Sequence, residues 1–298
     1  NSQIKFKDLG LLIIDEEQRF GVAHKEKIKN YKNSIDVLTL SATPIPRTLQ
    51  LSLANIRSLS LLETPPTNRF PIQTYVTSRN NNIIKEAIYK ELSRKGQVFV
   101  LYNRIDGIES KALEINNLVK EARVAYAHGR MKKEEIENIM LDFIDYKYDV
   151  LVCTTIIESG IDIPNVNTLI VMDSNQFGLS QLYQIRGRVG RGNKIAYCYL
   201  LYDSNKVLTE LATKRLKAIK EFTELGSGFS IAMRDLAIRG AGNILGDEQA
   251  GFIDSVGVDL FIQMLNEEVA KLNGTYVEKK ETNKALIDVT TSISDDYV

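Results

Sequence analysis

Short apolar runs alternate with longer amphipathic stretches along residues 72–201. Runs that are apolar throughout predict strands buried on both faces, and the apolar stripe within residues 83–92 predicts a helix. Strands are expected near residues 72–76, 97–102, 123–126, 149–153, 168–172 and 196–201. Strands that alternate with helices in this way indicate an α/β fold, a parallel sheet with helices on both faces.

Two further apolar runs precede this region, at residues 9–14 and 36–40, and both are expected to be buried strands. The first ends in the sequence DEEQ at residues 15–18, and the second continues into SATPIPR at residues 41–47. Paired prolines hold the backbone extended, so residues 64–69, which contain Pro65 and Pro66, are predicted to be a linker. We place a domain boundary there.

The strand pattern stops after Tyr202. A helical stretch is predicted over residues 206–224 and a second one to about Ile238, with glycines between and after them. This pattern indicates a helical hairpin. A further helix is expected at residues 259–272, and the polar tail that follows has no assignment. The predicted domains are residues 1–64, 65–205, 206–251 and 252–298.

Composition narrows the function. The 298 residues carry 38 basic and 38 acidic side chains, which argues against a wholly basic nucleic-acid coat, so phosphate binding requires local patches such as residues 186–194. Cys153 and Cys198 lie inside apolar runs and are expected in the core, and no zinc site is expected. No apolar run approaches the ~18 residues of a membrane span and no signal peptide is visible. A cytoplasmic protein is therefore expected.

The sequence QIRGRVGR at residues 184–191 is the strongest candidate for chemistry, and residues 184–194 contain no carboxylate. We expect residues 180–189 to be helical, which makes Gln184 and Arg188 i,i+4 neighbours. Arg188 and Arg191 could then neutralise the charge that spreads over a transferring phosphoryl group. The plainer alternative is a solvated basic face. We predict a triphosphate site here.

Acidic residues after the first strand are expected at the carboxyl edge of the sheet, where open α/β folds bind ligands. Asp15 is predicted to hold Mg²⁺ and Glu16 to orient water. Ser41 and Thr43 follow the next strand and would sense the nucleotide, or simply cap a helix. The chain contains no G-x-x-x-x-G-K-[ST] sequence, so it carries half of a nucleotide site. Because it begins at Asn1, we expect a piece of a longer protein with the phosphate loop upstream.

Four segments, at residues 15–18, 41–43, 154–164 and 184–191, resemble in this order motifs II, III, V and VI of superfamily 2 helicases. Within that superfamily, residues 19–22, 68–75 and 225–251 look like the bacterial transcription-repair coupling factor family, the Mfd translocases. The RecG fork-reversal helicases share the helical hairpin. One departure is Gln18, where the familiar form has His; glutamine keeps a hydrogen-bonding side chain.

The resemblance implies two RecA-like lobes: residues 1–64 end the first and residues 65–205 form the second. A translocation-motif hairpin follows at residues 206–251, and residues 252–298 lead toward a further domain. ATP and Mg²⁺ would bind between the lobes, with Gly160 and Asp162 bordering that cleft. Thr154 and Thr155 would grip a DNA phosphate. The hairpin's polar positions, matched here by Arg215, Arg239 and Gln249, would couple lobe closure to a step along DNA; taken alone, the two arginines would be exposed helix charges.

The implied function is an ATP-driven motor on double-stranded DNA that displaces stalled RNA polymerase and recruits a damage-recognition protein of excision repair. Modules upstream of this segment would make those protein contacts. By itself the chain should not hydrolyse ATP. The alternatives are fork reversal of the RecG kind, a passive phosphate- or DNA-binding module, and an RNA helicase, although no aromatic platform for stacked bases is evident.

Overall fold

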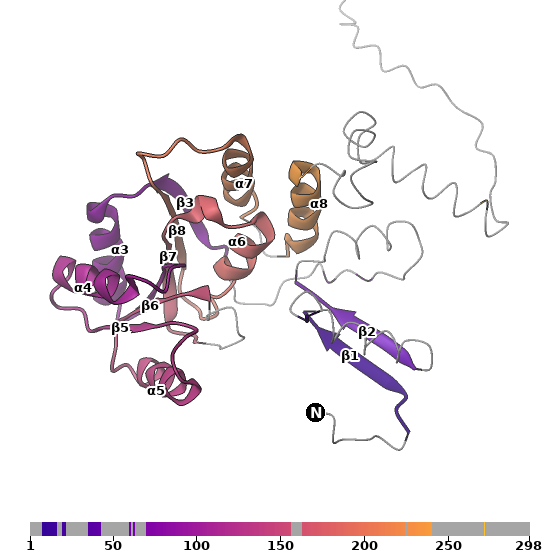
Figure 1. Ribbon diagram of the computed structural model, residues 1–298, viewed down its shortest axis with the longest axis horizontal. Helices are drawn as coiled ribbons and strands as arrows, with labels where there is room; N and C mark the ends of the chain where they lie inside the picture. The colour runs from indigo at the N-terminus through magenta and orange to yellow at the C-terminus, as the bar shows by residue number, and fades with distance from the viewer. Residues whose placement is uncertain are drawn as a thin grey trace, which may run out of the picture.

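The structure is a computed structural model that describes residues 8–16, 20–21, 35–42, 60, 62, 70–155, 163–223, 226–239 and 271, apart from the side chains of Leu236 and Arg239. Its main body is a sheet of six parallel strands in the order β3-β8-β7-β4-β6-β5 (Figure 1). The strands are β3 (Gln73–Ser78), β4 (Gln97–Leu101), β5 (Val124–Ala127), β6 (Val150–Cys153), β7 (Val166–Val171) and β8 (Tyr197–Tyr202). The predicted α/β class is confirmed, and each strand begins and ends within two residues of its expected position.

Helices cover both faces of this sheet (Figure 1). On one face lie α3 (Asn81–Ser93) and α4 (Ile108–Leu118), which bury apolar side chains against Val98, Val100 and Ile170. On the other lie α5 (Lys133–Ile144), α6 (Leu179–Arg186) and α7 (Glu210–Glu221). Alternate residues of one strand point to opposite faces, so the two cores share the same strands.

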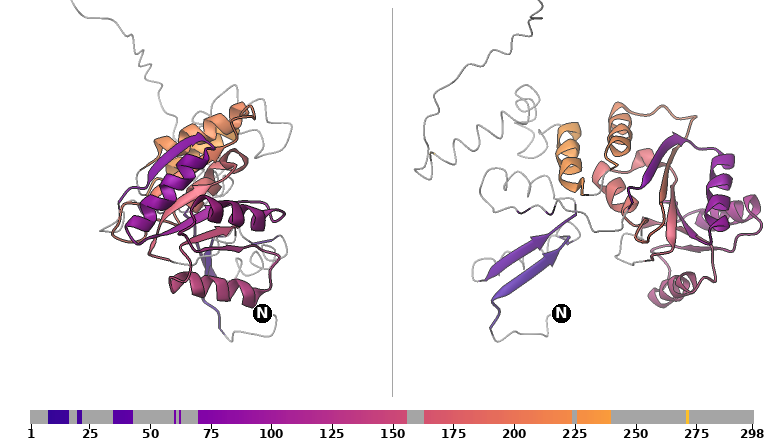
Figure 2. Two further views of the ribbon diagram at one scale, coloured as in Figure 1. Left: turned by 90° about the vertical axis from the view of Figure 1, so that its left-hand side faces the viewer. Right: turned by 180° about the vertical axis from the view of Figure 1, so that it is seen from behind.

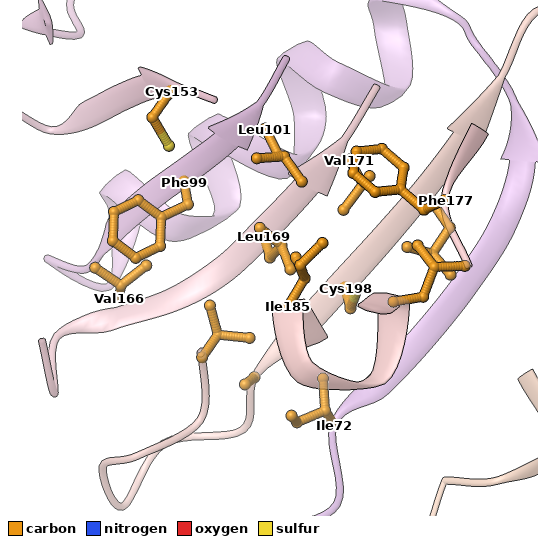
Figure 3. Packing of buried hydrophobic residues seen from close by; sticks show 14 of the residues in the cluster. Ile72, Phe99, Leu101, Cys153, Val166, Leu169, Val171, Phe177, Ile185 and Cys198 are labelled. Atoms are coloured by element: carbon orange, nitrogen blue, oxygen red, sulfur yellow. The ribbon is translucent and has the colours of Figure 1, made fainter. Parts of the chain in front are cut away.

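The core on the α5–α7 face is built from rows of side chains that cross neighbouring strands. Parallel pairing places Phe99 beside Leu169 and Leu169 beside Cys198, and Ile185 of α6 belongs to the same cluster (Figure 3). Full burial of one such apolar side chain contributes about 1.5–3 kcal/mol. Cys153 and Cys198 are both free and buried, so the prediction that they are core residues is confirmed.

A second, smaller sheet pairs β1 (Leu11–Asp15) with β2 (Asp36–Leu40) in parallel. Ile13 lies opposite Leu38, and both side chains are about half exposed, at 57% and 48%. Within this sheet only Ile14 is fully buried among the described residues. Because two strands alone are marginally stable in water, the small sheet depends on what packs against it.

Helix α8 (Gly228–Arg239) lies beside α6 and α7 and between the larger and the smaller sheet (Figures 1 and 2). Ile231 and Ala232 of α8 are buried, and Ile231 belongs to the same core cluster as α6 and α7. The second helical segment was predicted to end near Ile238, and its end agrees within one residue. The predicted linker at residues 64–69 and the helix at residues 259–272 lie outside the described residues, except for Lys271.

Predicted boundaries of two helices are wrong, and α7 also ends at Glu221 rather than at residue 224. Helix α7 begins at Glu210 rather than at residue 206, because the Thr209 hydroxyl accepts the Ala212 N–H at 3.2 Å and caps the first turn. Helix α6 ends at Arg186 instead of reaching residue 189. Gly190 has φ +74°, which cannot continue a right-handed helix, and the backbone N–H groups of Arg188 and Val189 bond three residues back instead.

None of the described helices is long and apolar enough to cross a membrane.

Candidate functional site

Glu16 is held at the carboxyl edge of the small sheet. Its backbone N–H donates to the Leu40 carbonyl at 2.9 Å, which extends the pairing of β1 with β2 by one residue. Its carboxylate accepts the Ser41 hydroxyl and the Ala42 N–H, each at 3.3 Å. Glu16 has φ +50°, a left-handed conformation that non-glycine residues adopt rarely and that is found at functional sites. The two residues that follow β2 therefore hold this carboxylate at the end of β1.

Asp15 is the last residue of β1 and its side chain is exposed. Among the described residues no group of three or more His, Cys, Asp or Glu side chains could enclose a metal ion. Magnesium is commonly held by one or two carboxylates together with water and substrate phosphates, so Asp15 and Glu16 fit such an ion better than they fit an all-protein cage. Ser41 contributes its hydroxyl to Glu16, and Thr43 lies outside the described residues.

The predicted phosphate-binding arginines lie on a turn after α6. Arg188 and Arg191 are half-buried, and the Arg191 Nε donates to the Gly187 carbonyl at 3.4 Å. A Cβ on Gly190 would come within 3.0 Å of the Ala196 Cβ, so the turn packs too closely for a larger residue. Gln184 stays in the last turn of α6. The expectation that Gln184 and Arg188 share one regular helix is therefore wrong, although the turn keeps both in one short segment.

Arg186 belongs to the core and not to the predicted basic patch. It is 4% exposed, and its guanidinium donates to the Ile219 carbonyl of α7 at 2.9 Å and to the Thr74 hydroxyl of β3 at 3.4 Å. Its guanidinium also lies 5.3 Å from the centre of the Tyr183 ring. Burial lowers the pKa of Arg186 from its ordinary value. The side chain ties α6 to two neighbouring elements.

Thr154 and Thr155 follow β6 at the carboxyl edge of the larger sheet. Thr154 is 7% exposed and its N–H donates to the Ala127 carbonyl at 3.3 Å, whereas Thr155 is half-buried. The turn after α6 lies at the opposite, amino edge, since a Cβ on Gly192 would come within 3.0 Å of the Pro164 carbonyl before β7. The structure thus separates the two predicted sets. Gly160 and Asp162 lie outside the described residues.

The sequence of this chain is similar to sequences of known proteins. Residues 79–193 match the model of the helicase conserved C-terminal domain. The chain is 63% identical over 289 residues to the transcription-repair-coupling factor of Bacillus subtilis, a match that covers 97% of this chain and 24% of that protein. The chain is thus similar in sequence to one segment of the transcription-repair-coupling factors. The coupling factor of Staphylococcus epidermidis is 60% identical over 278 residues, covering 93% of this chain and 24% of its own length.

The chain spans about a quarter of the length of these coupling factors. Among solved structures, RecG bound to a three-way DNA junction has a TM-score of 0.63 and 34% sequence identity, covering 89% of this chain and 34% of that chain. Saccharomyces cerevisiae Dbp5 bound to RNA and ADP BeF3 has a TM-score of 0.53 at 17% identity, covering 74% of this chain and 59% of its own, and shares the fold alone. The larger sheet is a RecA-like helicase C-terminal lobe.

The matched helicase domain lies inside the second predicted domain, residues 65–205, whose boundaries remain predictions. Among the predicted coupling residues, the structure describes only the side chain of Arg215. Arg215 of α7 is half-buried, and its Nε is buried with no hydrogen-bond partner in the described part of the chain. It is therefore not the exposed helix charge that its sequence context alone suggests. Arg239 ends α8, and its side chain and Gln249 lie outside the described residues.

The contacts of four residues of this region were not predicted by the sequence analysis. The Tyr183 hydroxyl of α6 accepts the Gly228 N–H of α8, and the Ser180 hydroxyl of α6 donates to the Asp235 carboxylate of α8 at 3.1 Å. Asp235 is 1% exposed. Each pair joins residues about 45 to 55 positions apart in the chain, so no local sequence pattern indicates it. Only the packing of α6 against α8 reveals them.

Proposed function

We propose that this chain is part of the ATP-driven motor of a double-stranded DNA translocase of the coupling-factor type. The observation that carries the proposal is the 63% identity over 97% of the chain to a transcription-repair-coupling factor. The geometry of Glu16 supports it, because its carboxylate is positioned by the loop after β2 in the manner that a water-orienting group requires. In the whole protein the motor would displace stalled RNA polymerase and bring in excision repair through modules outside this chain.

Each candidate residue has a role in this proposal. Asp15 and Glu16 would hold Mg²⁺, which supplies neutralisation of phosphate charge when it is bound, and Glu16 would accept a hydrogen bond from the attacking water. Arg188 and Arg191 would neutralise charge on the transferring phosphoryl group from the second lobe, while Gln184, Gly160 and Asp162 would border the nucleotide. Ser41 and Thr43, which follow β2, would sense whether nucleotide is bound.

The residues proposed to contact DNA lie at the carboxyl edge of the larger sheet, opposite the turn that carries Arg188 and Arg191. Thr154 and Thr155 would contact a DNA phosphate, Thr155 with the more accessible side chain. Thr154 is buried and its N–H already donates to the Ala127 carbonyl, so the accessible part of this contact would come from Thr155. Arg215, Arg239 and Gln249 would couple movement of the lobes to movement on DNA. In this arrangement nucleotide would bind at one edge of the larger sheet and DNA at the other. The lobe would then connect the two binding sites rigidly.

A second candidate is fork reversal, favoured by the similarity to RecG bound to a three-way junction. The experiment that separates the two uses a full-length coupling factor that carries this chain in place of its matching segment. ATP hydrolysis is measured without DNA, with linear duplex and with a three-way junction, alongside displacement of a stalled RNA polymerase. We expect linear duplex to stimulate hydrolysis and polymerase to be displaced.

Glu16→Gln in the same protein is the control, and it should retain nucleotide binding while hydrolysis is lost. Stimulation by the junction alone would favour fork reversal. Absence of any DNA-stimulated hydrolysis would favour a passive binding module. The 298-residue chain without the remainder should not hydrolyse ATP, since it contains no phosphate-loop sequence.

A further inference from the structure

Gly228, the first residue of α8, lies where three parts of the molecule meet. It is buried, and a Cβ built on it would overlap the Ala42 carbonyl oxygen of the loop after β2. The same Cβ would lie 3.5 Å from Cε1 of Tyr183 on α6. Backbone therefore packs directly on backbone between the small sheet and the helical pair α7–α8, with the Tyr183 ring beside them. We call this the Gly228 contact.

A hydrogen bond accompanies this packing. The Gly228 N–H donates to the Tyr183 hydroxyl, and it is one of the N–H groups at the start of α8 that have no partner within the helix. Burial raises the pKa of Tyr183, while the charge of Arg186 and the Gly228 N–H act in the opposite direction. The hydroxyl is therefore neutral in the physiological range and remains able to accept. Tyr183 serves as a side-chain cap for α8 supplied by another helix.

Both ends of the Gly228 contact lead to candidate catalytic groups. The Ala42 N–H donates to the Glu16 carboxylate at 3.3 Å, so the peptide groups on either side of Ala42 Cα join Glu16 to α8. Tyr183 precedes Gln184 in α6, and Arg186 of the same helix donates to the Ile219 carbonyl of α7 at 2.9 Å. Covalent neighbours and short contacts thus connect Glu16, α8, α6 and α7 without a gap.

We infer that Gly228 is a positioning residue through which the loop that holds Glu16 and the phosphate-binding end of α6 act together on the helical pair. The inference rests on the proposed function and adds to it a residue distinct from Arg215, Arg239 and Gln249. When nucleotide shifts the loop after β2, the amino end of α8 must follow it or the contact must break. Only glycine permits this approach, because any side chain holds Ala42 and α8 apart. Coupling then arises because two arrangements of the contact differ in nucleotide affinity.

The decisive variant is Gly228→Ala in the full-length coupling factor that carries this chain. Coupling free energies in proteins typically correspond to about 5–150-fold effects, so we expect a loss within that range in polymerase displaced per ATP hydrolysed. The matched control is Gly10→Ala, where an added Cβ meets nothing within 4 Å, and it should behave as the wild type. Unfolding temperature is recorded for each protein, because a purely structural role would lower it without changing displacement per ATP.

Tyr183→Phe is the second variant, and it keeps the inference testable if Gly228→Ala does not fold. It removes the hydroxyl and keeps the ring, so we expect a smaller loss of displacement per ATP. In the 298-residue chain alone, the same substitution should accelerate hydrogen exchange of the Gly228 amide. Wild-type displacement per ATP in both variants would overturn the inference while leaving the proposed function intact. An inactive wild-type protein would instead overturn the proposed function, and unchanged Gly228 exchange would then reject the contact independently.

Discussion

At the scale of single residues, Arg186, Arg188 and Arg191 have different environments although they lie within one short segment. Arg186 is 4% exposed and bonded to α7 and β3, whereas Arg188 and Arg191 are half-buried on the turn that follows α6. Guanidinium chemistry is the same in all three, so their surroundings decide their roles. Arg186 is positioned to stabilise the lobe, and the other two remain candidates for contact with phosphate.

Removal of either candidate phosphate contact should stop catalysis without unfolding the lobe. In the full-length coupling factor that carries this chain, Arg188→Ala or Arg191→Ala should lower ATP turnover by at least ~10³, the lower range for arginine fingers. Steady-state hydrolysis with duplex DNA measures the effect, and the unfolding temperature should stay near that of the wild type. Turnover retained with both arginines changed would refute their assignment.

Arg186→Ala should have the opposite signature in the 298-residue chain. It removes the donor to the Ile219 carbonyl and leaves a cavity beside α7, so we expect a loss of about 2–4 kcal/mol in the free energy of unfolding. Denaturant unfolding measures it. Arg130→Ala is the matched control, because Arg130 is 69% exposed and its 3.6 Å ion pair with Asp106 should contribute at most about 1 kcal/mol. Equal effects of the two substitutions would contradict the buried role.

A prediction about the two cysteines also belongs to this scale. Burial raises the pKa of the Cys198 thiol to about 12 and raises that of Cys153 as well. Because the thiolate is the reactive form, neither should react with a thiol reagent in the native protein at neutral pH. Both should react after denaturation. Rapid labelling of the folded chain would show that the strands open far more readily than their packing indicates.

At the scale of elements, the positions at which helices and strands end determine where the candidate residues lie. Helix α6 stops at Arg186, so the following arginines occupy a turn whose path is set by Gly190 at φ +74°. Strands β5 and β6 are joined at their amino ends by Arg123, whose side chain donates to both carboxylate oxygens of Asp149 at 2.8 and 2.9 Å. Apolar side chains hold the centre of the sheet together, and polar contacts such as this one join the ends of its strands.

The Arg123–Asp149 pair should give stability a defined pH dependence. Burial alone would raise the pKa of Asp149, but hydrogen bonds from Arg123 bring it below the ordinary value of 3.8. A depressed carboxyl pKa stabilises the fold above the unfolded value, and this contribution is lost as pH falls through 3.8 toward the folded pKa. Asp149→Asn should therefore lower the free energy of unfolding by about 1 kcal/mol at neutral pH and by progressively less in acid.

Denaturant unfolding of the wild type and of Asp149→Asn across that pH range measures the difference. Asp106→Asn is the control, since Asp106 is 95% exposed. A cost for Asp149→Asn that stays constant down to the lowest pH would reject the proposed linkage.

At the scale of the whole molecule, the small sheet differs from the larger one in how much apolar surface it leaves exposed. Leu11, Ile13, Leu38 and Leu40 alternate along β1 and β2 on one face, and each is between 44% and 57% exposed. By contrast, every residue of β4, β6 and β7 is buried. An apolar face of this kind normally contacts another element or another chain. The two runs were expected to be buried strands. The strands form as expected, but their burial was wrongly predicted, because nothing in the described residues covers this face.

The 298-residue chain should therefore self-associate with increasing concentration, as measured by light scattering. Replacing the opposed pair with Ile13→Thr and Leu38→Thr makes the face more polar, and association should fall. Threonine is β-branched and therefore suits a strand. Val207→Thr is the control, because Val207 is 98% exposed away from this sheet. A monodisperse wild-type chain would contradict the prediction.

Local sequence patterns determined the strands, most of the helices and the identity of the acidic and basic candidates, because a buried strand or an amphipathic helix is specified by side chains a few positions apart. Residues 36–40 illustrate this, since the observed β2 coincides with its prediction. Only the tertiary structure decided that Arg186 faces the core, that α6 ends before Arg188, and that Gly228 meets Ala42. Those outcomes depend on contacts with other elements. A local periodic pattern does not specify which distant segment of the chain will pack against a given residue.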